Sequence, residues 1–269
     1  MKIRFYPILL LFALLFAQPL WAQEQTELNQ TNAKGQKIGK WKGYYNDGSV
    51  RYVGQFKDDV PYGIFYHYYG DGKLQTKMVY RTPTEVFTSM FYSTGEKLAE
   101  GKYINKLKDS TWSTFGAESK VVEKGDYDMD KKVGVWRTFY LSSNISGEIN
   151  YYYNQKDGPY RMFYENGIVK DSSNFVAGKL HGFAVIRDME GNKVIQGNYN
   201  YGKKVGDWIY YGENETVDKV LKYDEYGELQ NPEELKMILE NLDQYSGNRK
   251  EVLEFEDLRG TIKYDKRDD

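Results

Sequence analysis

The residue types that most often carry out chemistry in proteins are scarce in this sequence. It has no cysteine, which excludes a thiol nucleophile, and only two histidines, His67 and His181. These histidines lie 114 positions apart, which is too far in a repetitive chain for them to share a metal ion or a catalytic triad. We interpret His181 as a surface residue of a turn and His67 as a structural residue of a strand.

Acidic residues are numerous, but most of them fall at expected turns, where Asp has a local hydrogen-bonding role. Asp126, Asp128 and Asp130 are spaced like the start of a calcium loop, yet the Gly and Glu of such a loop are missing. Glycoside hydrolysis needs two carboxyl groups about 5 to 9.5 Å apart, and no acidic pair interrupts the sequence pattern as an active-site insertion would. The sequence therefore predicts no enzyme, no cofactor and no metal site.

Aromatic residues recur at a fixed interval, and this repeat must position everything else. Steps of 24 residues, with one step of 23, connect a first column in which six of eight residues are aromatic. Its members are Trp41, Phe65, Thr88, Trp112, Trp136, Tyr160, Ala184 and Trp208. A second column, 15 residues further on, is aromatic in all eight repeats: Phe56, Tyr80, Tyr103, Tyr127, Tyr151, Phe175, Tyr199 and Tyr223.

A third column lies three residues after the first and is aromatic except at Arg187. Because side chains alternate across a strand, we expect the first two columns to share one face of a sheet and the third to lie on the other. Exposed aromatic groups tend to mark interaction sites. The candidate partner-binding residues are Tyr44, Tyr68, Phe91, Phe115, Phe139, Phe163 and Tyr211.

Glycines complete each unit as a β-hairpin. With Asp47-Gly48 as a two-residue turn, in which both residues need positive φ, Trp41 faces Gly54 and Phe56 faces Gly39. Each ring would then cover a glycine of the facing strand. A glycine two residues before the first column recurs in six repeats, with Val86 and Ser110 as the exceptions. The fifth repeat has no glycine in its tip, residues 141–145, and we expect a distorted loop there.

These patterns predict an all-β fold, an elongated single-layer antiparallel meander of about eight tandem 24-residue β-hairpins, or about 16 strands. The Gly-Lys-Leu-His-Gly stretch at 178–182, turn Gly191 and the Gly197-Asn-Tyr199 triplet resemble the MORN repeat. The longer period is similar to variant MORN repeats of exported bacterial proteins and of proteins described as antitoxin components. The resemblance implies the fold, and for function it implies scaffolding, partner binding or lipid binding.

The two ends of the chain differ from the array. Lys2 and Arg4 followed by an apolar run at 8–16 are typical of a signal peptide over 1–22, cut after Ala22. Residues 23–34 would form a linker, 35–229 the repeat array, and 230–269 a helix and a short strand segment. Without its signal the chain is mildly acidic, which argues against nucleic acid and strong lipid binding.

Asn231-Pro232-Glu233-Glu234 is a predicted helix start, with Asn231 as the cap. An apolar face follows at i, i+3, i+4 and i+7, and Gly247 would end the helix. We interpret the helix as a cap on the last hairpin; docking of a partner is the alternative. The face consists of Leu235, Ile238, Leu239 and Leu242.

The predicted function is a non-catalytic, exported scaffold that binds another protein, such as an envelope or outer-membrane component of a Gram-negative bacterium. It would be periplasmic, associated with the outer membrane, or secreted. One alternative is a carbohydrate-binding module that uses exposed Tyr and Trp rows. The other, suggested by the resemblance alone, is an antitoxin or immunity protein.

Overall fold

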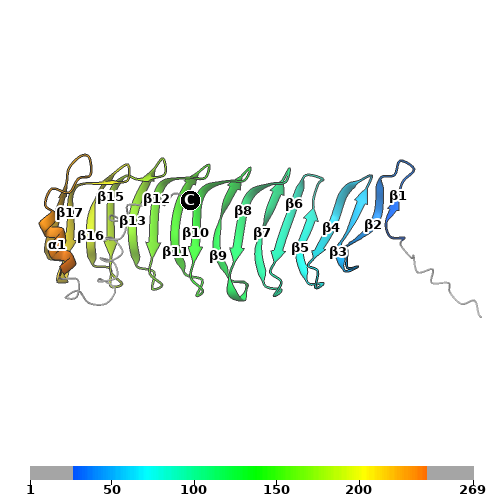
Figure 1. Ribbon diagram of the computed structural model, residues 1–269, viewed down its shortest axis with the longest axis horizontal. Helices are drawn as coiled ribbons and strands as arrows, with labels where there is room; N and C mark the ends of the chain where they lie inside the picture. Colours follow the sequence, from blue (N-terminus) through cyan, green and yellow to red (C-terminus); the bar gives the residue numbers. More distant parts are fainter. Residues whose placement is uncertain (1–26, 241–269) are drawn as a thin grey trace, which may run out of the picture.

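The computed structural model describes residues 27–240. They form one antiparallel sheet of 18 strands and one α-helix (Figure 1). This confirms the predicted all-β fold. The elements are β1 (Gln30–Thr31), β2 (Lys37–Tyr44), β3 (Val50–Lys57), β4 (Val60–Tyr68), β5 (Leu74–Tyr80), β6 (Glu85–Phe91), β7 (Lys97–Ile104), β8 (Leu107–Phe115), β9 (Val121–Asp128), β10 (Lys131–Phe139), β11 (Ile145–Tyr152), β12 (Gln155–Phe163), β13 (Val169–Val176), β14 (Lys179–Leu180), β15 (Gly182–Arg187), β16 (Lys193–Asn200), β17 (Lys203–Tyr211), β18 (Val217–Tyr223) and α1 (Pro232–Glu240).

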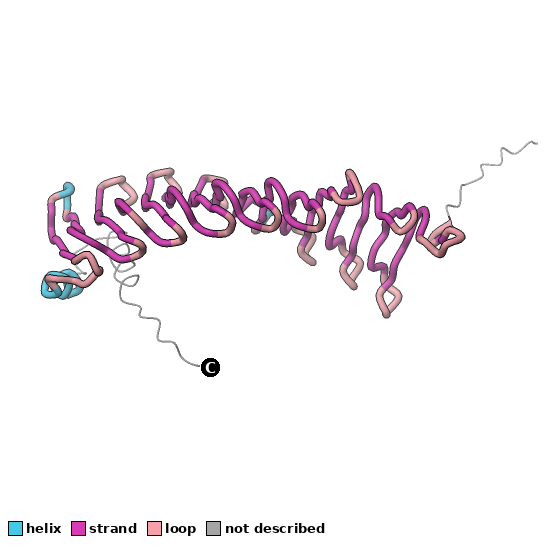
Figure 2. Tube along the Cα trace, turned by 90° about the horizontal axis from the view of Figure 1, so that it is seen from above, coloured by secondary structure: helices cyan, strands magenta, loops and turns pink. Residues whose placement is uncertain are grey.

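The strands follow one another as a meander, each pairing with its neighbours in sequence. The eight repeats are β2–β3, β4–β5, β6–β7, β8–β9, β10–β11, β12–β13, β15–β16 and β17–β18, and the two-residue strands β1 and β14 account for the difference from 16. Seen from above, the hairpins stand side by side in a single layer (Figure 2).

The predicted register is confirmed. Trp41 faces Gly54 and Gly39 faces Phe56, and Trp112 faces Gly125. The first and second columns therefore share one face of the sheet, which we name the ring face. We name the opposite face, on which the third column lies, the ion-pair face.

The turn prediction was wrong in type. At the first hairpin tip only Gly48 has positive φ, its N–H donates to the Tyr45 carbonyl, and the Tyr45 N–H donates to Ser49. A bulge beside Tyr44 adds a residue to β3, so the loop closes over three residues rather than two. The two-residue turns with two positive φ values join the repeats instead, as at Asp58-Asp59 and Asn105-Lys106.

The fifth tip is not distorted, contrary to the prediction. Ser143 takes the glycine position with φ of 71° and donates its N–H to Tyr140, as Gly48 does to Tyr45. The tips that differ belong to the fourth and eighth repeats, which contain the 3-10 turns η1 (Ala117–Ser119) and η2 (Glu213–Glu215).

The glycines serve two purposes, and the predicted ring-over-glycine pairs need correction. A Cβ on Gly54 would lie 2.2 Å from the Phe65 ring, and one on Gly101 would lie 2.3 Å from Trp112. Each ring thus covers a glycine of the preceding repeat rather than the residue it faces in its own hairpin. Gly39 would meet nothing within 4 Å, but its φ of 69° lies in the left-handed region that favours glycine.

An asparagine side chain closes the sheet at each end of the array. Asn29 donates to the Lys42 carbonyl and accepts from the Lys42 N–H. Asn231 donates to the Val220 carbonyl and accepts from the Lys222 N–H. Each side-chain amide bonds to a backbone N–H and a backbone C=O as a neighbouring strand would. It thus satisfies groups of a terminal strand that could otherwise pair with another chain. The side chain of Asn231 therefore binds β18, which corrects its predicted role as the helix cap.

Helix α1 packs on the last hairpin, as predicted. Ile238 is 1% exposed and belongs to a buried cluster with Trp208 and Leu221, and Leu235 packs against that cluster. No helix within residues 27–240 is long and apolar enough to cross a membrane. The predicted signal peptide, Leu242, Gly247 and the strand segment at 250–264 lie outside the described residues.

Candidate binding surface on the ion-pair face

The ring face is closed by its own side chains. Neighbouring rings meet edge to face, with centroids 5.2 Å apart for Phe56 and Phe65 and 5.0 Å apart for Tyr127 and Trp136. Such contacts stabilise beyond simple area burial. Trp112, Trp136 and Trp208 are all buried, so the tryptophan rings offer little surface to a ligand.

A row of lysines, which was not predicted from the sequence, lies over these rings. The Lys132 ammonium is 3.7 Å from the centroid of Trp136, within the range of a cation–π interaction. The signal was present in the sequence as a lysine four residues before the first column. The row consists of Lys37, Lys108, Lys132, Lys156 and Lys204.

The residues of the predicted third column differ in their solvent exposure. Tyr44 is exposed, Phe115 and Tyr211 are buried, and Tyr68, Phe91, Phe139 and Phe163 are half-buried. The column also has a structural role, because tyrosine hydroxyls of the preceding repeats donate to its backbone carbonyls, as Tyr45 does to Tyr68 at 2.7 Å. The same bond joins Tyr69 to Phe91 and Tyr140 to Phe163.

Exposed apolar residues of the ion-pair face also lie in another column, one residue before the first. Ile64 is 41% exposed and Phe87 is 42% exposed. Val79 stands between them, because it pairs with Ile64 on one side and Phe87 on the other. Tyr62, 44% exposed, lies two residues before Ile64. We name Tyr62, Ile64, Val79 and Phe87 the exposed patch.

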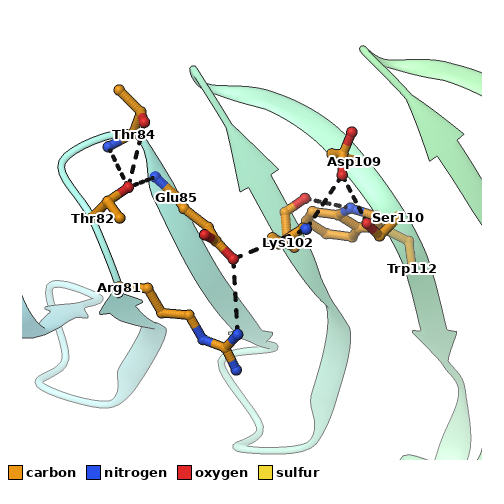
Figure 3. Close-up of polar contacts among 8 residues, drawn as sticks. All are labelled: Arg81, Thr82, Thr84, Glu85, Lys102, Asp109, Ser110 and Trp112. Carbon is orange, nitrogen blue, oxygen red and sulfur yellow. Dashed lines mark hydrogen bonds and ion pairs between the residues drawn. The ribbon is translucent and has the colours of Figure 1, made fainter.

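Charged residues line one side of the exposed patch, and Figure 3 shows the ion pairs that they form. Lys102 faces Phe87 across the strands, and its Nζ lies 4.0 Å from Glu85 Oε1 and 3.4 Å from Asp109 Oδ1. Arg81 Nη1 lies 3.9 Å from the same Glu85 oxygen. An apolar centre beside a polar rim is the usual anatomy of a protein interface.

The irregular loop before the third repeat positions this rim. Thr82 Oγ1 accepts the backbone N–H groups of Thr84 and Glu85 (Figure 3), which fixes the start of β6. Between this loop and the turn before β4 lies an open cleft of about 410 Å³. Its walls include Val60, Pro61, Tyr62, Tyr80, Arg81 and Pro83. The cleft shares Tyr62 with the exposed patch and extends that surface to the edge of the sheet.

Comparison with protein families gives a match to part of the chain. A family described as "MORN repeat variant" matches residues 37–58, 61–81 and 156–177. The chain contains MORN repeat variants at these three positions. They correspond to the first, second and sixth hairpins, and the same register continues through the other five.

Comparisons with curated proteins and with solved structures add little to this match. No curated protein matches it. Among solved structures, "Crystal Structure of TarM" is 14% identical, with a TM-score of 0.27, and the match covers 33% of this chain and 18% of that one. A mutant of S. aureus TarM in complex with Fondaparinux, alpha-GlcNAc-glycerol and UDP is 14% identical, with a TM-score of 0.22 and coverages of 45% and 21%. The chain thus spans about a fifth of the TarM chains.

The two histidines lie apart within the hairpin array and have different surroundings. His67 is beside Tyr52, with ring centroids 5.8 Å apart, and burial together with the nearby charge of Arg51 lowers its pKa. The ring centroids of His181 and Tyr201 lie 4.7 Å apart. His181 lies between β14 and β15, as predicted for a residue of an inter-repeat turn, but it is half-buried. Among residues 27–240, no group of three or more His, Cys, Asp or Glu side chains could hold a metal ion.

Proposed function

We propose that this chain is a non-catalytic, exported MORN-repeat scaffold that binds another protein of a bacterial envelope. The observation that carries the proposal is the exposed patch on a single-layer sheet. Tyr62, Ile64 and Phe87 are each more than 40% exposed, and they join through Val79 into one apolar surface beside the ion pairs of Lys102.

The arrangement favours a protein partner over a carbohydrate. A sugar-binding row would need flat rings open to solvent, and the tryptophans at 112, 136 and 208 are covered on the ring face. A patch of aliphatic and aromatic side chains with a rim of opposite charges is instead complementary to another protein surface. The antitoxin role remains a prediction from the resemblance alone.

The test is a cross-linking pull-down from envelope extracts with matched variants. Ile64→Asp and Phe87→Asp place a charge in the exposed patch, and Val135→Asp does the same in the fifth repeat of the same column. All three wild-type side chains are at least 38% exposed, so each variant should fold, which circular dichroism verifies. We expect a stoichiometric partner that wild type and Val135→Asp retain and that the two patch variants lose.

Two outcomes would overturn the proposal. One is that wild type retains no stoichiometric protein. The other is that all variants retain the same protein equally, which would place binding away from the exposed patch. Binding to immobilised glycans by wild type and loss of that binding in the patch variants would support the carbohydrate alternative.

A further inference from the structure

The two long edges of the sheet carry opposite charges. One edge consists of the eight hairpin tips, residues 45–49, 69–73, 92–96, 116–120, 140–144, 164–168, 188–192 and 212–216, which we name the tip edge. These loops contain nine acidic residues and only two lysines, Lys73 and Lys120. The acidic residues are Asp47, Asp71, Glu96, Glu118, Glu165, Asp188, Glu190, Glu213 and Glu215, all exposed except Asp188.

The other long edge consists of the seven connections between repeats, which we name the turn edge. It comprises residues 57–61, 80–84, 104–108, 128–132, 152–156, 176–180 and 200–204. These loops contain four acidic residues and ten basic ones. The exposed basic residues are Lys57, Arg81, Lys106, Lys131, Lys179 and Lys203. The chain leaves the last repeat through Asp224 and Glu225, so the basic edge ends at the seventh connection.

Both edges have the same spacing because one hairpin contributes one loop to each. The meander places the tips and the connections on opposite long sides (Figure 1). Each repeat advances the sheet by two strands, or about 10 Å. A second copy of this chain therefore offers, on a tip edge that is acidic as a whole, loops at the same interval as those of the basic turn edge.

Apolar side chains accompany the charges on both edges. Met129, Tyr153 and Tyr201 are between 46% and 66% exposed on the turn edge, and Leu141 and Met189 are 57% and 47% exposed on the tip edge. Contacts between such groups would add apolar burial to the attraction between charges. Surface charges alone contribute little, so this addition matters.

We propose that copies of this chain associate side by side, with the tip edge of one molecule against the turn edge of the next. The contact joins two different surfaces. An assembly of any number of copies therefore keeps one unoccupied tip edge and one unoccupied turn edge, and it is open-ended. The contact uses the loops of the two edges, including Arg81, whereas Tyr62, Ile64, Val79 and Phe87 of the exposed patch lie on strands outside those loops, so it stands independently of the proposed function.

The test uses two charge-reversed full-length variants. The tip variant carries Glu118→Lys, Glu165→Lys, Glu190→Lys and Glu213→Lys, and the turn variant carries Lys106→Glu, Lys131→Glu, Lys179→Glu and Lys203→Glu. Each variant has two edges of like charge and should repel its own copies. A mixture of the two variants restores opposite edges. A control variant reverses four strand lysines, Lys40, Lys77, Lys124 and Lys222.

Sedimentation velocity measures the outcome. Wild type and the strand control should form species larger than a monomer at about 20 mM salt and return towards the monomer at about 300 mM, where charges are screened. Each reversed variant should be monomeric, and the equimolar mixture should associate at least about tenfold more tightly than either alone. Monomeric wild type at low salt, or a mixture that stays monomeric while both variants are folded, would overturn the proposal.

Discussion

The first repeat and the last two repeats share one sequence spacing but differ in how deeply their aromatic side chains are buried. Trp208 is 1% exposed and lies in a cluster with Ile195, Leu221 and Ile238. Trp41 occupies the same position in the first repeat but is only half-buried, with Phe56 and Lys37 as its ring contacts. The spacing therefore sets register, whereas burial depends on what covers the ring face.

Helix α1 and aliphatic residues create this difference. Ala184 replaces a ring in the first column, and Ile186, Val194 and Ile195 fill the space around it, all of them buried. Ile238 from α1 then covers the cluster. The C-terminal end thus has a conventional core, while the second and third repeats present the exposed patch on the opposite face. We infer that stability is concentrated at one end and binding nearer the other.

The largest expected effect is that of removing the last tryptophan. Trp208→Ala should lower the free energy of unfolding by about 3 to 5 kcal/mol, because it leaves a cavity in a closed core. Trp41→Ala should cost about 1 to 2 kcal/mol, since its ring is only half-buried. Urea unfolding monitored by circular dichroism compares them. Equal losses would remove the distinction between the two ends.

Removing the contact between α1 and the sheet should have the next largest effect. Ile238→Ala should cost about 2 to 4 kcal/mol by the same cavity argument. Met237→Ala is the control, because that side chain is 42% exposed on the same helix. If thermal unfolding showed the two variants to be alike, α1 would not be the cover of the core.

Two glycines of the last two repeats test the two roles of glycine separately. Gly197→Ala would place a Cβ 2.3 Å from the Trp208 ring, and such overpacking should cost about 1 to 3 kcal/mol. Gly206→Ala meets no atom within 4 Å but has φ of 67°, and should cost about 1 kcal/mol. The denaturant midpoints of the two variants compare these losses. If Gly197→Ala did not lower stability, the Trp208 ring would not lie against that glycine.

Removing either terminal asparagine should have a smaller, local effect. Asn29→Ala and Asn231→Ala each remove a side chain that makes two hydrogen bonds to an edge strand, at about 1 kcal/mol per bond. Faster exchange of the Lys42 and Lys222 amides, respectively, would be the signature. Unchanged exchange in both variants would mean that these amides are protected by other groups.

The smallest expected effect is on pH dependence. Because burial and Arg51 lower the pKa of His67, the unfolded chain takes up a proton at higher pH than the folded chain. Stability should therefore fall as pH decreases through about 6.5, the ordinary histidine value. His67→Gln should make unfolding less dependent on pH in that range. An identical pH profile in wild type and variant would contradict this assignment.

The sequence predicted the repeat, its register and the capping helix, because these follow from regular spacing such as that which pairs Trp41 with Gly54 in the register. It did not predict which loops hold two positive φ values, because that depends on the bulge beside Tyr44. It also did not separate Phe115, which is buried, from Tyr44, which is exposed, since both occupy one column. Exposure is set by neighbouring repeats, and Ile64 and Phe87 belong to a column without aromatic regularity.

Amide hydrogen exchange along the array tests the central claim, that a uniform repeat has a stable end and a more accessible remainder. The account predicts the slowest exchange in β15–β18, next to the cluster of Trp208, Leu221 and Ile238, and faster exchange in β2–β6. Equal protection in all eight repeats, or slower exchange in β2–β6 than in β15–β18, would contradict it.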